Sequence, residues 1–466
     1  MRQGETMLNR THLVFAAAAV LAACDVRADV TVDPSAEIGP IKPMNAVNNG
    51  PTRAGRSQQR ENFTTYKAAK IPFARTHDSI NCVSGGAHTC DITAVFPDFS
   101  ADETVPANYD FVFTDTYLKR IRDAETEVFF RLGQTIEHGP KKYGTLPPKD
   151  FAKWARICEH VIRHYNEGWA DGFKWDIRYW EIWNEPDLEK DDDPDKRCWG
   201  GTEAEFFEFF VIAAKHLKTA FPALKIGGPA LAWRKDWADR FLKRMSDEKV
   251  PLDFFSWHVY CATPERVAED ARYFRRLLDR HGYGKSESIL NEWNYKRDWK
   301  TGFVENIRVI SGLKGAAFEA AVMCKCQNEP VDMLMYYDAR LSTVFNGLFD
   351  LYTYAPRKGY WAVYAWSRLA ERGRQIACSA TEQDIYAVAA RSPDGKVSVM
   401  VSRYTDDDNV FGCIEVPVKV QGCASAKVRV RQLDSRFDFA DAPFETKGDS
   451  IVLSLEPRAF ALVEFQ

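Results

Sequence analysis

The 466-residue sequence lacks any apolar run long enough to cross a bilayer and any strong excess of one charge. Its main apolar run near the N-terminus, residues 13–23 (LVFAAAAVLAA), is shorter than the roughly 20 residues that a membrane-spanning helix needs. The 62 Lys and Arg residues nearly balance 66 Asp and Glu residues, for a formal net charge of −4. This balance leaves no electrostatic footprint for a polyanion, and we expect no nucleic-acid partner.

The sequence also lacks a Cys and His arrangement with the spacing of zinc ligands, although it holds eleven cysteines. The pair in 324–326 (CKC) is too close for an easy mutual bond and has no second pair nearby. We therefore expect no metal and no cofactor. The candidate disulfides are Cys82–Cys90, which brackets a Gly-Gly loop, and Cys413–Cys423, which flanks predicted strands.

The N-terminal residues 1–24 have the pattern of an export signal, because Arg10 precedes the short apolar run. Residues 21–24 (LAAC) match a lipobox, in which Cys24 would become the lipidated first residue of a bacterial lipoprotein. Ordinary signal cleavage after Ala28 is the alternative. Both routes export the protein, so we expect a periplasmic or outer-surface lipoprotein anchored through Cys24, or alternatively a secreted protein, in a compartment where disulfides persist.

The most informative stretch is 179–187 (YWEIWNEPD), an apolar run that stops at an Asn-Glu pair before a proline. The aromatic and β-branched residues favour a buried strand, and Pro186 cannot donate to a sheet ladder. The run therefore predicts a strand whose end carries Asn184 and Glu185 into a cavity. A carboxyl group held at such a place is a candidate general acid.

A second stretch, 288–294 (SILNEWN), repeats the pattern, with an apolar strand closing on Glu292 beside Asn and Trp. Cleavage of an acetal in a glycoside uses two carboxyl groups, one on each side of the bond. Either glutamate alone reads equally well as a surface residue at a strand terminus. Two strand-end glutamates in matching aromatic and amide settings favour a catalytic pair.

Strands and helices alternate along the chain, which predicts an α/β protein with a closed parallel (β/α)8 TIM barrel over residues 41–370. The remaining residues 371–466 contain short apolar runs separated by turns, which predicts an accessory β-sandwich. Residues 25–40 form an N-terminal segment that can join this β-sandwich. The expected barrel strands lie in 42–51, 71–75, 127–132, 179–187, 225–229, 252–260, 288–294 and 333–337.

Polar residues follow several of these strands, at the edge where barrel sites are assembled. His258 and Tyr260 are two apart on one strand, so both can point inward. Hydrogen bonds from Tyr260 and Arg75 would keep Glu292 ionised. The expected substrate-binding residues are Arg75, His77, Asn184, His258, Tyr260, Asp338 and Arg340.

The WNEPD and LNEWN stretches, together with 75–79 (RTHDS) and 257–260 (WHVY), resemble glycoside hydrolase family 39, over about 39–366. This family belongs to a clan of retaining glycosidases built on (β/α)8 barrels. The resemblance implies that Glu185 is the acid/base and Glu292 the nucleophile. It also implies that Asn184 and His77 hold hydroxyl groups of the sugar at the nucleophile.

Three functional readings remain open at this point. The first is a retaining O-glycosyl hydrolase acting on poly- or oligosaccharides, similar to β-xylosidases or β-galactosidases. The second is an endo-acting glycosidase of a sister family in the clan, which would use the same chemistry. The third is a non-catalytic surface protein that binds sugar, for which a missing carboxylate would be the mark, and both carboxylates are present.

Overall fold

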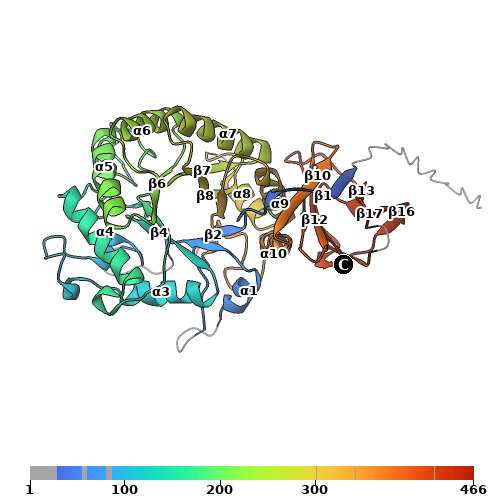
Figure 1. Cartoon of the computed structure of the whole chain (residues 1–466), viewed down its shortest axis with the longest axis horizontal. Coiled ribbons are helices and arrows are strands. Elements are labelled where there is room, and N and C mark those ends of the chain that lie inside the picture. The colour runs from blue at the N-terminus through green and yellow to red at the C-terminus, as the bar shows by residue number, and fades with distance from the viewer. Residues whose placement is uncertain (1–28, 55–59, 80–86, 301, 342, 424–425) are drawn as a thin grey trace, which may run out of the picture.

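A computed structural model describes residues 29–54, 60–79, 87–300, 302–341, 343–423 and 426–466. The chain forms a barrel surrounded by helices and, beside it, a curled β-sheet that contains the C-terminus (Figure 1). The described helices include none that is both long and apolar enough to span a membrane. The predicted export signal, Cys24 and Cys82 all lie outside the described residues.

Eight parallel strands close into the barrel in sequence order. The closure is made by β2, which pairs with β3 on one side and with β9 on the other. This confirms the predicted fold class. The barrel strands are β2 (Ala46–Asn48), β3 (Phe73–Arg75), β4 (Glu127–Leu132), β5 (Tyr179–Ile182), β6 (Lys225–Leu231), β7 (Phe254–Cys261), β8 (Glu287–Tyr295) and β9 (Met333–Tyr336).

Side chains from alternate positions of these strands fill the interior of the barrel. Phe129, Tyr179, Phe254 and Ile289 belong to one buried cluster there. Because successive residues of a strand point to opposite faces, Tyr179 and Glu181 both point inward from β5, with Glu181 closer to the carboxyl end of the strand. The lower half of the barrel is thus an apolar floor, and the polar site is built above it.

Helices follow the strands and bury their apolar stripes against the outside of the barrel. On α4, residues spaced as on one face of a helix are buried at Trp154, Ile157, Cys158 and Val161. The longer helix α5 begins with a capping box, in which Thr202 and Glu205 exchange hydrogen bonds. The helices are α1 (Phe63–Ala68), α2 (Ile92–Val95), α3 (Val112–Asp123), α4 (Phe151–Asn166), α5 (Glu203–Ala220), α6 (Lys235–Asp247), α7 (Pro264–Arg280), α8 (Phe303–Ile310), α9 (Leu313–Gln327) and α10 (Lys358–Ala370).

The second unit is one ten-stranded sheet with the order β15-β14-β18-β12-β11-β10-β1-β13-β17-β16. Strands from both ends of this order contribute to one apolar core, so the sheet curls around it in the manner of a sandwich. The N-terminal strand lies inside this sheet, antiparallel to β10 and parallel to β13. Its strands are β1 (Val30–Pro40), β10 (Arg374–Ala380), β11 (Ile385–Arg391), β12 (Val397–Tyr404), β13 (Ile414–Val420), β14 (Val428–Leu433), β15 (Asp438–Asp441), β16 (Glu445–Lys447), β17 (Ser450–Leu455) and β18 (Arg458–Phe465).

Strand β12 joins the two units because both of its faces are buried. Val399 and Val401 point into the core of the curled sheet, whereas Met400 belongs to the core of the barrel unit. The Ser402 hydroxyl donates to the carbonyl oxygen of Ala317 in α9 at 2.9 Å. The sheet therefore covers one side of the barrel, and Asp406, which follows β12, accepts from the Tyr295 hydroxyl at the end of β8 at 2.7 Å.

The predicted Cys413–Cys423 disulfide is wrong, because both cysteines are free in the structure. They lie before and after the same strand, β13 (Ile414–Val420). A strand of this length separates its ends by roughly 20 Å, far beyond the 4.4–6.8 Å between the α-carbons of a disulfide. The sequence prediction placed the pair around two strands, whereas the structure has the single strand β13 between them.

Candidate active site

The backbone turns sharply after β5 and carries Glu185 into the mouth of the barrel. Trp183 and Glu185 adopt φ values of 72° and 47°, which non-glycine residues rarely do. Two flanking strands hold this turn, since Trp183 N–H donates to Leu132 O at 2.7 Å and Glu185 N–H donates to Ala230 O at 2.9 Å. The strand thus ends at Ile182, before Pro186, and tertiary hydrogen bonds stabilise the strained geometry.

Glu292 is placed differently, inside β8 rather than at its end, so the expectation that the strand closes on Glu292 is wrong. The pairing with β7 skips from Leu290 to Glu292, which leaves Asn291 as the extra residue of a bulge. A bulge breaks the alternation of faces. Asn291 and Glu292 consequently both contact residues inside the barrel, although they are adjacent in sequence.

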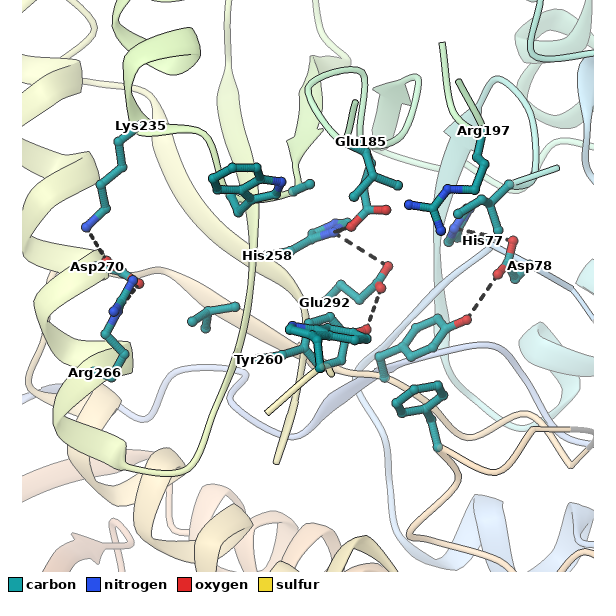
Figure 2. Close-up of a pocket in the computed structure, with 18 of the residues that line it drawn as sticks. His77, Asp78, Glu185, Arg197, Lys235, His258, Tyr260, Arg266, Asp270 and Glu292 are labelled. Atoms are coloured by element: carbon teal, nitrogen blue, oxygen red, sulfur yellow. Dashed lines mark hydrogen bonds and ion pairs between the residues drawn. The ribbon is translucent and has the colours of Figure 1, made fainter. Parts of the chain in front are cut away.

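A cavity of about 610 Å³ opens at this edge of the barrel. Glu185, His258 and Glu292 meet near the middle of the view, with Tyr260 below Glu292 (Figure 2). Its lining combines carboxyl groups with cations and exposed aromatic rings. The lining residues are His77, Asp78, Ile136, His138, Glu185, Leu188, Arg197, Ala232, Trp233, Lys235, His258, Val259, Tyr260, Arg266, Asp270, Phe274, Glu292, Trp299, Tyr337 and Phe345.

Glu185 receives little stabilisation of a negative charge from its neighbours. His258 Nδ1 lies 2.9 Å from one carboxyl oxygen, and the Cys198 thiol lies 3.9 Å from the other. Burial raises the pKa of Glu185 to about 8, and the nearby carboxylate of Asp187 adds to the rise. Burial also lowers the pKa of His258 to about 4, so this ring is neutral at pH 7. Glu185 is accordingly protonated in the resting site.

Glu292, by contrast, is surrounded by donors. The Tyr260 hydroxyl donates to one carboxylate oxygen at 2.5 Å, and Arg75 Nη1 donates to the other at 3.3 Å. These are the two hydrogen bonds expected from the sequence. Burial raises the pKa of Glu292, while Arg75 and Tyr260 oppose the rise. When the two glutamates hold one proton between them, these contacts keep the charge on Glu292.

Arg75 organises the residues beneath the cavity. It is fully buried, and its Nε donates to Glu181 at 2.7 Å while Nη2 donates to Asn184 at 2.7 Å. The same guanidinium also donates to Glu292 and Asn48 through Nη1, so each of its three nitrogens has a partner. The side chain does not line the cavity, and its contact with substrate stays a prediction. It acts as a support that fixes Asn184 and Glu292.

His77, Asp78 and Tyr337 form one end of the cavity. His77 Nε2 lies 3.3 Å from Asp78, whose other carboxylate oxygen accepts the Tyr337 hydroxyl at 3.0 Å. The His77 Nδ1 atom has no hydrogen-bond partner within the described chain, and burial lowers the pKa of this histidine well below its usual value. A neutral imidazole at the cavity wall is suited to a sugar hydroxyl.

Asp338 and Arg340 lie outside the cavity lining, and their contact with substrate stays a prediction. Arg340 donates to the Asp78 carbonyl oxygen and, at 3.1 Å, to the Tyr337 hydroxyl. Asp338 is fully buried, and burial raises its pKa to about 7. Both residues thus support the Asp78 and Tyr337 end from behind. Asn184 is likewise outside the lining, held by Arg75.

Several residues of the site were not predicted from the sequence. Trp233 and Trp299 are 63% and 61% exposed at the cavity mouth, on loops after β6 and β8. Both tryptophans follow a barrel strand in the sequence, which could have marked them as site residues, but most Trp residues in the chain belong to the core. Glu181 was not predicted either. The sequence places this acidic residue inside an apolar strand, where a charged group needs a buried partner, and Arg75 is that partner.

Glu185, His258 and Glu292 are also the one group in the described chain that could ligate a metal, with ligand atoms within 4.8 Å of one another. The set contains one neutral imidazole and two carboxyl groups, which could bind a divalent ion. Such an ion would compete with the proton on Glu185. We still expect no resident metal, and treatment with a chelator should leave activity unchanged.

The barrel with a half-buried Glu185 and a buried Glu292 facing each other at its carboxyl edge defines the class of barrel proteins equipped for acid/base chemistry on glycosides. Comparison with known families makes this specific. The model of glycosyl hydrolases family 39 matches residues 28–276, more than half of the chain. The chain belongs to this family.

Curated relatives point to the same family. The chain is 26% identical over 242 residues to a protein named beta-xylosidase from Geobacillus stearothermophilus, covering 49% of this chain and 45% of the relative. It is 34% identical over 121 residues to a beta-xylosidase from Caldicellulosiruptor saccharolyticus, covering 26% and 23%. The aligned regions thus span less than half the length of these relatives.

Solved structures resemble nearly the whole chain. A glucosidase from Croceicoccus marinus superposes with a TM-score of 0.78 at 22% identity, covering 95% of this chain and 99% of that one. A monomeric beta-xylosidase from Caulobacter crescentus gives 0.69 at 16% identity, covering 94% and 99%. At these identities the resemblance establishes the fold: barrel and curled sheet occur together in both.

Proposed function

We propose that this protein is a retaining glycoside hydrolase that cleaves β-xylosidic bonds of oligosaccharides. The observation that carries the proposal is the closeness of the two carboxyl groups, each of which has an oxygen within 4.8 Å of the other. Retaining glycosidases hold this pair about 5–5.5 Å apart, whereas inverting enzymes leave about 6.5–9.5 Å for a water molecule. The names of the two curated relatives support xylose as the sugar.

In the first step, a Glu292 oxygen attacks the anomeric carbon as the bond to the leaving oxygen breaks. Glu185 gives its proton to that oxygen, so the leaving group departs as a neutral alcohol. In the second step, Glu185 takes a proton from water, and the water oxygen displaces Glu292 from the anomeric carbon. The Tyr260 hydroxyl stabilises the carboxylate of Glu292 before attack and after release.

The substrate lies across the pair of glutamates. The sugar to be transferred would occupy the end formed by His77, Asp78 and Tyr337, all of which line the cavity. The leaving group would then extend past Glu185 toward Trp233. This direction follows from the role that the family resemblance gives to His77.

A panel of nitrophenyl glycosides tests the proposal. We expect the β-xyloside to be hydrolysed fastest, with the product released first as the β-anomer. Inclusion of the β-glucoside and β-galactoside tests the sugar itself, since a structural relative is a glucosidase. Inversion, or no turnover of any glycoside by correctly folded protein, would contradict the proposal.

Export remains part of the proposal, since the N-terminal signal lies outside the described residues. Mass spectrometry of membrane and soluble fractions would find Cys24 as the first residue, with lipid attached, if the lipobox is used. A mature chain starting after Ala28 would mark ordinary cleavage and a secreted protein.

A further inference from the structure

One half of the cavity carries charges that the hydrolytic mechanism does not use. Lys235 begins α6, and Arg266 and Asp270 lie on α7. In Figure 2 these three residues lie together on the left, across the two glutamates from His77 and Asp78. All three line the cavity, on the side that the leaving group would enter.

The three residues form a preorganised positive site. Asp270 is buried; it forms an ion pair with Lys235 Nζ at 2.6 Å and accepts from Arg266 Nε at 2.8 Å. Two cations around one carboxylate leave one positive charge in excess. The side chains of Lys235 and Arg266 remain 39% and 54% exposed. Asp270 therefore holds both cations in place but neutralises only one of their two positive charges.

Arg266 is held through one of its three side-chain nitrogens. Its Nε contacts Asp270, whereas Nη1 and Nη2 have no hydrogen-bond or ion-pair partner in the part of the chain that is described. Two parallel N–H groups of a guanidinium match the two oxygens of a carboxylate. The ammonium of Lys235 is close enough to share Asp270, so it can contact the same incoming anion.

An exposed aromatic ring lies in the same half of the cavity. Trp233 is two residues before Lys235, and its backbone N–H donates to Asp187 at 3.0 Å. Asp187 follows Glu185 closely in sequence, so this contact ties the Trp233 loop to the acid/base segment. The indole offers a flat apolar surface for the ring of a bound sugar.

We propose that this half of the cavity is a subsite for a uronic acid residue on the leaving-group side of the scissile bond. The sugar ring packs on Trp233, and its carboxylate binds the free edge of Arg266 together with Lys235. The placement on the leaving-group side rests on the proposed function. The anion selectivity rests on the charges alone and is testable without turnover.

The binding test compares methyl β-D-glucuronide with its methyl ester, which differ in one negative charge, by isothermal titration calorimetry on the full chain. The acid should bind about tenfold or more tightly than the ester, since hydrogen bonds to a charged group discriminate on this scale. Arg266→Gln and Lys235→Gln should each remove most of this preference and leave ester binding unchanged. Added salt should weaken the binding of the acid only.

Arg276→Gln is the matched control, because Arg276 lies on the same helix α7 but outside the cavity lining. It should leave the preference for the acid intact. Equal binding of acid and ester, no binding of the acid, or an equal loss in the Arg276 variant would overturn the subsite.

A kinetic test separates this inference from the proposed function. A disaccharide of xylose linked to glucuronic acid, and its methyl ester, should be hydrolysed with kcat/KM values about tenfold apart in favour of the acid. If neither is hydrolysed while the acid still binds preferentially, the proposed function fails and the subsite stands. Faster hydrolysis of the ester by the wild-type protein would contradict the subsite while supporting the glycosidase.

Discussion

The turn after β5 and the interior of β8 present the same residue type in opposite surroundings. Glu185 sits on a strained turn and contacts a neutral histidine and a thiol, whereas Glu292 sits in a bulged strand and accepts from Tyr260 and Arg75. The hydrogen-bond donors around each carboxyl group therefore determine which glutamate is the acid and which is the nucleophile. Loss of water contact raises the pKa of both, so this effect alone would make both of them acids.

Glu292→Gln should cause the largest loss of activity. It keeps the shape but removes the nucleophilic oxygen, so kcat should fall by about 10⁴-fold to 10⁶-fold. The melting temperature should not fall, because the substitution also removes a buried carboxylate with an elevated pKa. Near-native turnover of nitrophenyl glycosides by this variant would reject Glu292 as the nucleophile.

Glu185→Ala tests the other side of the comparison. Loss of the acid should slow substrates with poor leaving groups by about 10² to 10⁴-fold and affect activated aryl glycosides less. Azide should partly restore activity on activated substrates, because a small anion can replace water in the second step, and a glycosyl azide should form. The same loss on good and poor leaving groups, without an azide product, would argue that Glu185 is not the acid/base.

Tyr260→Phe removes one hydrogen-bond donor from Glu292 and leaves the contacts of Glu185 unchanged. Activity should fall about 10 to 1000-fold, or roughly 1.4 to 4 kcal/mol. The nucleophile must be ionised, so activity is lost as pH falls through its pKa. Loss of the hydroxyl raises that pKa and should move the acidic limb of kcat/KM upward. An unchanged acidic limb with a near-native rate would mean that Tyr260 only packs there.

The basic limb of the pH profile of kcat/KM reports the ionisation of Glu185. Glu185 must be protonated, so activity should be lost as pH rises through its pKa of about 8. Measurement of kcat/KM against pH on a substrate with a poor leaving group checks this value. A basic limb near pH 5 would contradict the contrast drawn between the two glutamates.

Cys198→Ala should give the smallest effect. The Cys198 thiol is a weak donor to the Glu185 carboxylate, so its loss disfavours the charged form and should raise the basic limb by about half a unit. The rate near neutral pH should change by about two- to fivefold at most. Cys198→Ser retains a donor and is the matched control. A basic limb that moves downward would show that the thiol does not stabilise the carboxylate.

The sequence predicted the barrel and the positions of both glutamates because buried parallel strands leave continuous apolar runs, and polar residues at their ends stand out. It could not predict the bulge at Asn291, which depends on pairing between β7 and β8. Nor could it separate residues that line the cavity from those that support it. Arg75 and Arg340 follow strands as His77 does, but both are taken up by buried partners.

The subsite half of the cavity escaped prediction for a related reason. Lys235, Arg266 and Asp270 belong to two different helices, and their charges look like ordinary solvated positions in the sequence. Their proximity is a property of how α6 and α7 pack around the barrel. The i,i+4 spacing of Arg266 and Asp270 was visible, but such pairs are common on helix surfaces.

The most direct test of the central claim is to trap the glycosyl-enzyme with the 2-deoxy-2-fluoro glycosyl fluoride of the best-hydrolysed sugar and to map the labelled peptide by mass spectrometry. Our account predicts a one-to-one adduct on Glu292, formed more slowly in Tyr260→Phe and absent in Glu292→Gln. An adduct on Glu185, or turnover with inversion and no adduct, would contradict it.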